Sequence, residues 1–507
     1  MSSSSRNHRR RIAIAALLTL YPAAHSAALA QPRSLRGLDS YATKAVADWG
    51  VPGLSIAVVH GDSIVFAKGY GVRELGTGGA VDEHTLFAVG STTKAMTVVA
   101  LGMLVDSGQV AWDDPVVRHL PRFRLIDPAV TAQTTIRDML SHRSGLGTVD
   151  LIWYAAGGTV GDVVGRLRHQ PLASSPRSRY AYQNAMYAAA GAVVESASGV
   201  PWDRFLRERI FAPVGMANAR TSVVGLDTAA NVATPHDVIA DTLRPVAHRN
   251  LDNIAPAGAV YAGARDMANW MRFLLDTGRV GGRRLLSEAS WREMLTPQFL
   301  VPRNSFYPTA SLTKPHFTAY GLGWFLQDYR GELVAMHTGS IDGMVAILGL
   351  LPERGVGVVV LANRDHAELR HALMWRVFDA YLGLPARDWS MEFRTLYDSL
   401  AARGRAGAAQ REQRVSGTRP SLSLDRYAGT YADSLYGVLA VRHDGGRLTI
   451  DFGPGRVADV EHWHYDTFRA TWRDPELGRT FATFSLGRDG TVRELVLERY
   501  GRLERSR

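Results

Sequence analysis

The stretch "LFAVGSTTKAMTVVALGMLV", residues 86–105, places a serine and a lysine three positions apart at the start of a long uncharged run. Residues 95–105 contain no charged side chain and a single hydroxyl, so a helix here would be apolar on nearly every side and must be buried. Side chains three positions apart share a helix face, which puts the Lys94 amine beside the Ser91 hydroxyl. The stretch therefore predicts a buried helix with a polar pair at its first turn.

This polar pair has the chemistry of a nucleophile and its base. Backbone N–H groups at a helix start are free to donate to a developing oxyanion. Burial favours the neutral form of a lysine amine, and a neutral amine within hydrogen-bond reach can accept the serine proton during attack. The alternative is structural: Ser91 caps the helix and Lys94 extends its amine to water.

Lysine is rare in this chain, which supports a special use for Lys94. Lysine occupies only four positions, so 54 of the 58 basic residues are arginine. The four are Lys44, Lys68, Lys94 and Lys314. Arginine does not lose its proton in proteins, so a lysine retained here is a candidate for an amine that must become neutral.

The serine–lysine pattern occurs a second time, at Ser311 and Lys314 in "TASLTKPHF". Pro315 follows this lysine directly and disfavours helical geometry for it. The surrounding residues are those of a polar loop. We therefore expect only the first copy to be functional.

The composition is that of an ordinary globular chain with room for two or three domains: 507 residues, 46% hydrophobic, 21% charged and a net charge of +10. The first thirty residues differ, because arginines at 6–11 precede the apolar run "IAIAALLTL" and a small-residue ending at Ala30. This is the pattern of a secretory signal peptide cleaved after Ala30, with an uncleaved anchor as the alternative. We predict a periplasmic or secreted protein whose mature chain has no membrane span.

Several classes of function find no support in the sequence. The absence of cysteine excludes disulfides, a cysteine nucleophile and thiolate metal sites. The arginines are scattered, without a basic block interleaved with aromatics, so we expect no nucleic-acid partner. His462 and His464 would share one strand face, but no third ligand accompanies them, and we predict no metal and no cofactor.

The order of secondary-structure patterns predicts two domains. Two β-rich runs at 51–60 and 63–72 come first, mostly helical patterns follow to about residue 270, and β patterns return at 320–364. Such an order is typical of an α+β domain, here residues 31–386, in which early and late strands share an antiparallel sheet flanked by helices. A charged surface helix and linker at 387–423 would lead to a small all-β barrel at 424–507.

Two further motifs follow the first. The segment "RYAYQNAMYAAAG" contains Tyr182-Gln183-Asn184, and "VAMHTGSIDG" contains His337-Thr338-Gly339 at the end of a predicted strand. With S-x-x-K, Y-x-N and H-T-G in this order, the chain resembles the serine β-lactamases and penicillin-binding peptidases. It is most similar to the branch with class C β-lactamases, D-aminopeptidases, DD-carboxypeptidases and related esterases. The resemblance spans about residues 38–385 and implies an all-helical lobe beside the sheet; the C-terminal region resembles a lipocalin-like barrel appended to many members.

The resemblance implies a role for each motif. Ser91 would be the acylated nucleophile, Lys94 its proton acceptor and Tyr182 the partner that moves a proton to the leaving group or activates the deacylating water. Which of Lys94 and Tyr182 holds the proton at each stage stays open. The substrate would be held by a second set of residues, with the backbone N–H groups of Ser91 and Ser340 as the oxyanion hole. The members of that set are Asn184, His337, Thr338, Gly339 and Ser340.

The predicted function is hydrolysis of amide or ester bonds through an acyl-enzyme, on small-molecule or peptide substrates such as β-lactams or peptides with D-residues. Histidine at position 337, where many β-lactamases have lysine, weakens a β-lactamase assignment without excluding it. An esterase with the same residues and a catalytically idle penicillin-binding or sensor protein remain as alternatives. We expect the C-terminal domain to lie outside the catalytic machinery, bordering the cleft at most.

Overall fold

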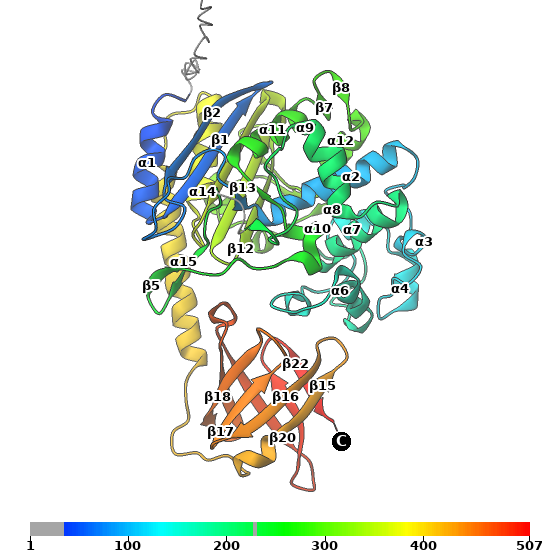
Figure 1. Ribbon diagram of the computed structural model, residues 1–507, viewed down its shortest axis with the longest axis vertical. Coiled ribbons are helices and arrows are strands. Elements are labelled where there is room, and N and C mark those ends of the chain that lie inside the picture. Colours follow the sequence, from blue (N-terminus) through cyan, green and yellow to red (C-terminus); the bar gives the residue numbers. More distant parts are fainter. Residues whose placement is uncertain (1–34, 227–230, 507) are drawn as a thin grey trace, which may run out of the picture.

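The computed structural model describes residues 35–226 and 231–506, so the predicted signal peptide lies outside the described residues. A large domain of strands and helices precedes a C-terminal β-barrel, and the long helix α15 (Trp389–Arg411) runs from the first toward the second (Figure 1). No helix in the described part of the chain has the length and apolar character needed to cross a membrane.

An antiparallel eight-stranded sheet forms the centre of the large domain, in the order β2-β1-β14-β13-β12-β11-β10-β9. Its strands are β1 Gly53–His60, β2 Ser63–Gly71, β9 Phe299–Leu300, β10 Thr318–Tyr320, β11 Phe325–Tyr329, β12 Glu332–Ile341, β13 Met344–Leu351 and β14 Val356–Ala362. The first strand pairs with the last, with Ile56 opposite Val360. Early and late strands therefore share one sheet, and the predicted α+β class is confirmed.

Helices cover both faces of this sheet because its central strands are apolar on both sides. Along β1, Leu54, Ile56 and Val58 belong to the core beneath α1 (Leu38–Trp49) and α14 (Leu369–Tyr381). The alternate residues Ala57 and Val59 belong to the core on the opposite face, where α11 (Ala264–Leu275) packs on β1 and β14. The period of two along the strand thus fills two cores at once.

The lobe beside the sheet is built from helices around α2 (Thr93–Asp106), which packs against α7, α10 and α12. Its other helices are α3 Val116–His119, α4 Pro128–Gln133, α5 Ile136–Leu140, α6 Val160–Arg166, α7 Asn184–Ser198, α8 Trp202–Phe205, α9 Ala212–Val214, α10 Ala255–Gly258 and α12 Glu288–Met294. The short helix α13 (Ala310–Thr313) belongs instead to the core beneath α1 and α14. Residues 93–102 of α2 are all buried. The uncharged sequence of this helix is therefore explained by its central position, as predicted.

Short strand pairs complete the large domain: β3 Phe87–Ala88 with β6 Tyr261–Ala262, β4 His236–Ile239 with β5 Thr242–Pro245, and β7 Arg279–Val280 with β8 Arg283–Arg284. The helix α15 was expected on the surface, but its first half packs on α14 and buries Trp389 and Phe393. Five of the six charged residues in its 23-residue sequence follow this apolar start.

The C-terminal domain is a closed antiparallel barrel in which each strand pairs with the next and β15 pairs with β22. Its strands are β15 Gly429–Asp433, β16 Gly437–Asp444, β17 Arg447–Asp451, β18 Val457–His464, β19 Thr467–Trp472, β20 Arg479–Leu486, β21 Val492–Leu497 and β22 Gly501–Arg505. Tyr431, Leu439 and Ile450 are fully buried, as expected for the inward positions of a small barrel. The predicted all-β domain is therefore confirmed.

Candidate active site

Ser91 lies in a short 3₁₀ turn, Gly90–Thr92, that leads directly into α2. Gly90 has φ +52°, and a Cβ at this position would lie 2.9 Å from the amide nitrogen of Ser340. A Cβ at Gly339 would lie 1.9 Å from the carbonyl oxygen of Val89. A residue with a Cβ at either position would prevent the turn and the strand β12 from approaching so closely, so both positions require glycine. The third motif is therefore pressed against the turn that carries the serine.

Lys94 is fully buried below Ser91 and holds three polar contacts. Its Nζ lies 2.9 Å from the Ser91 Oγ, 2.7 Å from the Asn184 Oδ1 and 2.9 Å from the carbonyl oxygen of Ala257. A neutral amine keeps two N–H groups and one lone pair. Two donations to the Asn184 and Ala257 oxygens leave that lone pair facing the Ser91 hydroxyl.

Burial holds the pKa of Lys94 well below its ordinary value, and the nearby charge of Asp150 opposes this shift. The amine also lies 4.9 Å from the ring centre of Tyr182 and 5.3 Å from that of Tyr187. Aromatic rings and carbonyl oxygens surround the amine in place of water. The geometry and the electrostatics both favour Lys94 as a proton acceptor.

Asn184 is the first residue of α7 and links the serine–lysine pair to a carboxylate. Its Nδ2 donates to the Asp150 Oδ1 at 3.0 Å, while its Oδ1 accepts from Lys94. Asp150 also accepts from the Trp153 indole at 2.9 Å. The amide orientation is therefore fixed from both sides, and Asn184 is not a helix cap, because the cap residue is Gln183.

Tyr182 closes the other side of the nucleophile. Burial raises the pKa of Tyr182 well above its ordinary value, and a hydrogen bond with Ser91 opposes that rise. The Tyr182 ring lies 4.3 Å from the ring of the buried His142, centre to centre. The phenol is thus a neutral donor, held in place by ring packing.

His337 is buried on β12, and both of its ring nitrogens are occupied. Its Nδ1 donates to the carbonyl oxygen of Thr338 at 2.7 Å, because a carbonyl can only accept, and its Nε2 accepts from the Tyr320 hydroxyl at 3.0 Å. Burial lowers the pKa of His337 to about 3. The imidazole is therefore neutral and supplies no positive charge to the site.

Hydrogen bonds from neighbouring elements hold the other residues of the third motif in place. Both the N–H and the hydroxyl of Thr338 donate to the Tyr307 hydroxyl, at 3.1 Å each. The buried guanidinium of Arg370 donates to the Gly339 carbonyl at 2.6 Å and to the Ser340 Oγ at 2.9 Å. These two supports fix the strand that faces Ser91.

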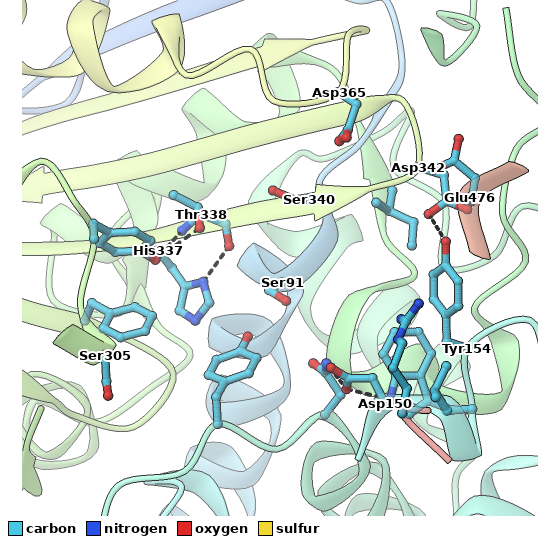
Figure 2. A pocket seen from close by; sticks show the side chains of 18 of the residues that line it. Ser91, Asp150, Tyr154, Ser305, His337, Thr338, Ser340, Asp342, Asp365 and Glu476 are labelled. Carbon is cyan, nitrogen blue, oxygen red and sulfur yellow. Dashed lines mark hydrogen bonds between the residues drawn. The ribbon is translucent and has the colours of Figure 1, made fainter. Parts of the chain in front are cut away.

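Ser91 opens into a cleft of 590 Å³ whose walls come from all three motifs and from the barrel. Figure 2 shows Ser91 between the β12 residues His337, Thr338 and Ser340 on one side and Asp150 on the other. Lys94 and Gly339 do not line the cleft, since they lie beneath its floor. The eight residues predicted from sequence thus meet in one place.

One end of the cleft is acidic, and the barrel contributes to it (Figure 2). Arg249 joins Asp342 of the large domain, at 2.5 Å, to Asp474 of the barrel, at 2.8 Å. Glu476 and Asp365 lie beside this bridge in the cleft wall. Burial and the Asp342 charge raise the pKa of Glu476 to about 8.

The barrel therefore takes part in forming the cleft. We expected it to lie outside the catalytic machinery, and the hydrogen-bonded group around Ser91 does contain no barrel residue among those described. Glu476 and Arg499 nevertheless line the cleft wall. Strand alternation in residues 424–507 predicts a barrel but gives no sign that the turn after β19 reaches another domain.

The second serine–lysine pattern has a different structure. Ser311 and Lys314 are both exposed, and the Ser311 hydroxyl donates to the Pro308 carbonyl at 2.8 Å. The helix α13 ends at Thr313, and Lys314 has φ +53°. No hydrogen bond joins Ser311 to Lys314, so the expectation that this copy has no function agrees with its geometry.

Sequence reasoning missed several residues that shape the site: Asp150, Ala257, Tyr307, Arg370, Asp342 and Glu476. Ala257 acts through its backbone carbonyl, which no side-chain pattern reveals. Asp150 lies in a 3₁₀ turn, Asp150–Ile152, that α6 separates from the Y-x-N motif, so no local pattern marks it. Arg370 and Tyr307 lie far from β12 in sequence, and only the fold brings them to it.

The histidine pair of the barrel lies at an irregularity of strand β18. The pairing of β18 with β19 shifts register between His462 and His464, and His462 donates to the Tyr465 carbonyl at 2.9 Å. Within residues 35–226 and 231–506, no group of three or more His, Cys, Asp or Glu side chains is placed to hold a metal ion.

Comparison with known proteins agrees with this geometry. The family model described as Beta-lactamase matches residues 38–381. The chain belongs to this family. A second model, described as a domain of unknown function (DUF3471), matches residues 413–505, which include the barrel.

Two similar proteins support hydrolase activity for this member of the Beta-lactamase family. Unguisins hydrolase ungD of Aspergillus violaceofuscus is 30% identical over 464 residues, which cover 83% of this chain and 80% of that protein. Penicillin-binding protein 4 of Amycolatopsis lactamdurans is 30% identical over 323 residues, covering 62% of this chain and 81% of that protein.

Solved structures share the fold over almost the whole chain. The octameric penicillin-binding protein homologue from Pyrococcus abyssi superposes with a TM-score of 0.62 at 22% identity, covering 92% of this chain and 99% of that one. SurE superposes with a TM-score of 0.56 at 21% identity, covering 93% and 99%. The arrangement of a large domain followed by a barrel is thus common to these proteins.

Proposed function

We propose that this protein is an exported serine hydrolase that cleaves amide or ester bonds through an acyl-enzyme on Ser91. The observation that carries the proposal is the 2.9 Å approach of the buried Lys94 amine to the Ser91 hydroxyl. Burial lowers the pKa of the amine, and two carbonyl oxygens occupy its N–H groups. A lysine in this state is a base, whereas a charged lysine is not.

In the first step, the Ser91 oxygen attacks the substrate carbonyl while Lys94 accepts the serine proton. The bond to the leaving group then breaks, and that group takes a proton from the Tyr182 hydroxyl, which Lys94 restores. Water next attacks the acyl-serine ester and gives a proton to the same pair, which returns that proton to the Ser91 oxygen as the ester bond breaks and the acid is released. The backbone N–H groups of Ser91 and Ser340 are proposed to hold the oxyanion in both steps.

Tyr182 and Lys94 suit opposite roles. Burial raises the pKa of the phenol and lowers that of the amine, so at neutral pH the phenol holds a proton and the amine accepts one. This difference supports Lys94 as the base during acylation and Tyr182 as the acid toward the leaving group. The Oδ1 of Asn184 accepts a hydrogen bond from the Lys94 amine and so holds the amine in position.

The charges of the cleft favour peptide substrates with a free amino group over substrates with a carboxylate. His337 is neutral, and the acidic end holds Asp365, Glu476 and Asp342, of which Asp342 is paired with Arg249, while Arg499 also lines the wall. An ammonium group there would favour the ionised form of Glu476, while a carboxylate would be repelled. Amides of D-amino acids and short peptides with D-residues are the proposed substrates; β-lactams, which carry a carboxylate, are expected to react more slowly.

Export is proposed from the signal-peptide pattern in residues 1–30. Expression of the full chain in a bacterial host and mass measurement of the recovered protein test this point. A mature N-terminus at Gln31 in the periplasmic fraction supports export. An intact N-terminus in the cytoplasmic fraction contradicts it.

A fluorophosphonate probe tests the acyl-enzyme mechanism, with peptide mapping of the labelled site. We expect stoichiometric labelling of Ser91 and no labelling of Ser311. An unlabelled protein would indicate the idle sensor alternative. Labelling at another serine would reject Ser91 as the nucleophile.

A substrate panel then tests the specificity. It contains D-amino-acid nitroanilides with free and with acetylated amino groups, D-Ala-D-Ala peptides, nitrocefin and short-chain nitrophenyl esters. We expect kcat/KM to be highest for the free amine. Turnover of the esters alone would make the protein an esterase, and a preference for nitrocefin would reject the amine hypothesis.

A further inference from the structure

A second cavity, of 920 Å³, lies behind the catalytic strand and is separate from the cleft. It is enclosed by the end of α1, the loop before α13, the segment before α14 and the middle of α15. These elements cover the outer face of the sheet, where Figure 1 shows α1 and α15. The volume is within the range of small-molecule sites in proteins.

One buried side chain in this cavity has no hydrogen-bond partner. His371 is 1% exposed, and neither of its ring nitrogens forms a hydrogen bond with any described residue. Its Nε2 lies 3.4 Å from the Glu368 Oε2 without hydrogen-bond geometry. Buried polar groups are nearly always satisfied, so an imidazole left open on a cavity wall indicates a missing partner.

The cavity is also lined by one arginine, Arg364, that forms no direct ion pair with a described carboxylate. Its three acidic residues are paired: Asp48 with Lys44, Glu368 with Arg370 and Asp398 with Arg394. Arg364 donates only to the backbone carbonyls of Trp49 and Gly50, and no described carboxylate lies within ion-pair distance of it. Arg364 is half-buried and lines the cavity, so an anionic group inside could form a charge-assisted hydrogen bond with its guanidinium.

The remaining wall is apolar and aromatic. Trp49, Tyr397, Leu400 and Pro308 line it together with the small side chain of Ala401. An occupant that satisfies the whole cavity therefore needs one anionic group and an apolar body. We propose that this cavity is a second ligand site that takes a small monocarboxylate with an apolar ring or chain.

This site shares its inner wall with the catalytic cleft. Tyr307 lines both cavities, and its hydroxyl accepts the Thr338 N–H and hydroxyl. Arg370 lines the second cavity and donates to the Gly339 carbonyl and the Ser340 Oγ. A ligand there would touch the two residues that fix the third motif, so its binding is expected to change turnover. The expected change of turnover rests on the proposed function, whereas the binding of a ligand to this cavity does not.

Calorimetric titration of the mature protein with benzoate and 4-phenylbutyrate tests the site, with benzamide and 4-phenylbutanol as uncharged matches. We expect one binding event per chain and an affinity about tenfold or more higher for the carboxylates, because a charge-assisted bond to Arg364 is lost in the uncharged pair. Prior labelling of Ser91 with the fluorophosphonate should leave binding intact. No binding, equal affinities for charged and uncharged probes, or loss of binding after labelling would overturn the proposal.

Variants locate the ligand. Ala401→Trp fills the cavity from an exposed helix position and should abolish binding, whereas its neighbour Ala402→Trp, which does not line the cavity, should leave it unchanged. Arg364→Gln should weaken carboxylate binding about tenfold, with the exposed Arg283→Gln as control. Unaltered binding in Ala401→Trp would overturn the site. If the carboxylate binds but ester and amide turnover do not change, the link to the catalytic strand is overturned while the ligand site stands.

Discussion

The chain contains the same four-residue pattern in two environments, at Ser91–Lys94 and at Ser311–Lys314. In the first, Lys94 is fully buried and its amine contacts the serine, Asn184 and a backbone carbonyl. In the second, both side chains are exposed and Lys314 lies just past the end of a four-residue helix. Identical spacing therefore produces a polar contact in one place and none in the other.

The environments of Lys94 and Lys314 differ in their exposure to water and in the groups that surround each amine. Around Lys94 the fold excludes water, and this loss of solvation favours the neutral amine over the ammonium. Water surrounds Lys314, and no polar side chain is fixed beside it among the described residues. The reactivity of the serine thus depends on the burial of the lysine. The three-residue spacing only allows the lysine amine to reach the serine hydroxyl.

Replacing the two serines gives the largest expected contrast. Ser91→Ala removes the nucleophile and should reduce kcat/KM on any accepted substrate by about 10⁴-fold or more. Ser311→Ala removes one exposed hydroxyl and should leave kcat/KM within a factor of two. Steady-state assays of both variants, with circular dichroism to check folding, measure the contrast. Equal losses in the two variants would show that the structural difference has no functional meaning.

Replacing the two lysines by arginine tests the neutral amine directly. Arginine remains charged, so Lys94→Arg should lose about 10²–10⁴-fold in kcat/KM, the range ascribed to general-base catalysis. Lys314→Arg keeps an exposed charge and should have wild-type activity. Single-turnover labelling with the fluorophosphonate separates the base from later steps. Wild-type labelling rates in Lys94→Arg would mean that another group takes the serine proton.

Much of this arrangement could be predicted from sequence, because the signals are local. The uncharged run at 95–105 predicted a buried helix, and the three motifs predicted which side chains meet around Ser91. The alternation of apolar residues in the last eighty positions predicted a barrel. The helix and the barrel need only the period of the chain, whereas the meeting of the three motifs was implied by the resemblance to a known family.

The parts that could not be predicted depend on contacts between distant segments. Arg370 reaches the carbonyl of Gly339 because α14 packs on β13 and β14, which no spacing reveals. Asp474 meets Arg249 across 225 positions, and Glu476 follows it into the cleft. The neutral state of His337 likewise depends on burial and on the Tyr320 hydroxyl, not on the H-T-G motif itself.

The pH dependence of kcat/KM gives a smaller test. The rate should rise with pH as Lys94 loses its proton, and the Asp150 carboxylate raises the pKa of that amine. Asp150→Asn removes this charge, so the acid limb of the profile should move to lower pH. His337 cannot produce the limb near neutrality, because its pKa is about 3. The control is Asp62→Asn, at an exposed turn, which should not move the pH profile. A shift of the acid limb to higher pH in Asp150→Asn would contradict the assignment of Lys94 as the base.

The smallest expected effect concerns stability at the second pattern. Lys314 has φ +53°, a conformation that disfavours any residue with a Cβ, whereas glycine adopts it freely. Lys314→Gly should therefore raise the free energy of unfolding by about 0.5 kcal/mol, since relief of strain exceeds the entropy that glycine adds to the unfolded chain. Lys314→Ala keeps the Cβ and removes only the amine, so its stability should match wild type. Urea unfolding curves measure the stability of both variants, and ester turnover measures their activity. Any loss of turnover in Lys314→Ala would give this lysine a functional role, which its exposure argues against.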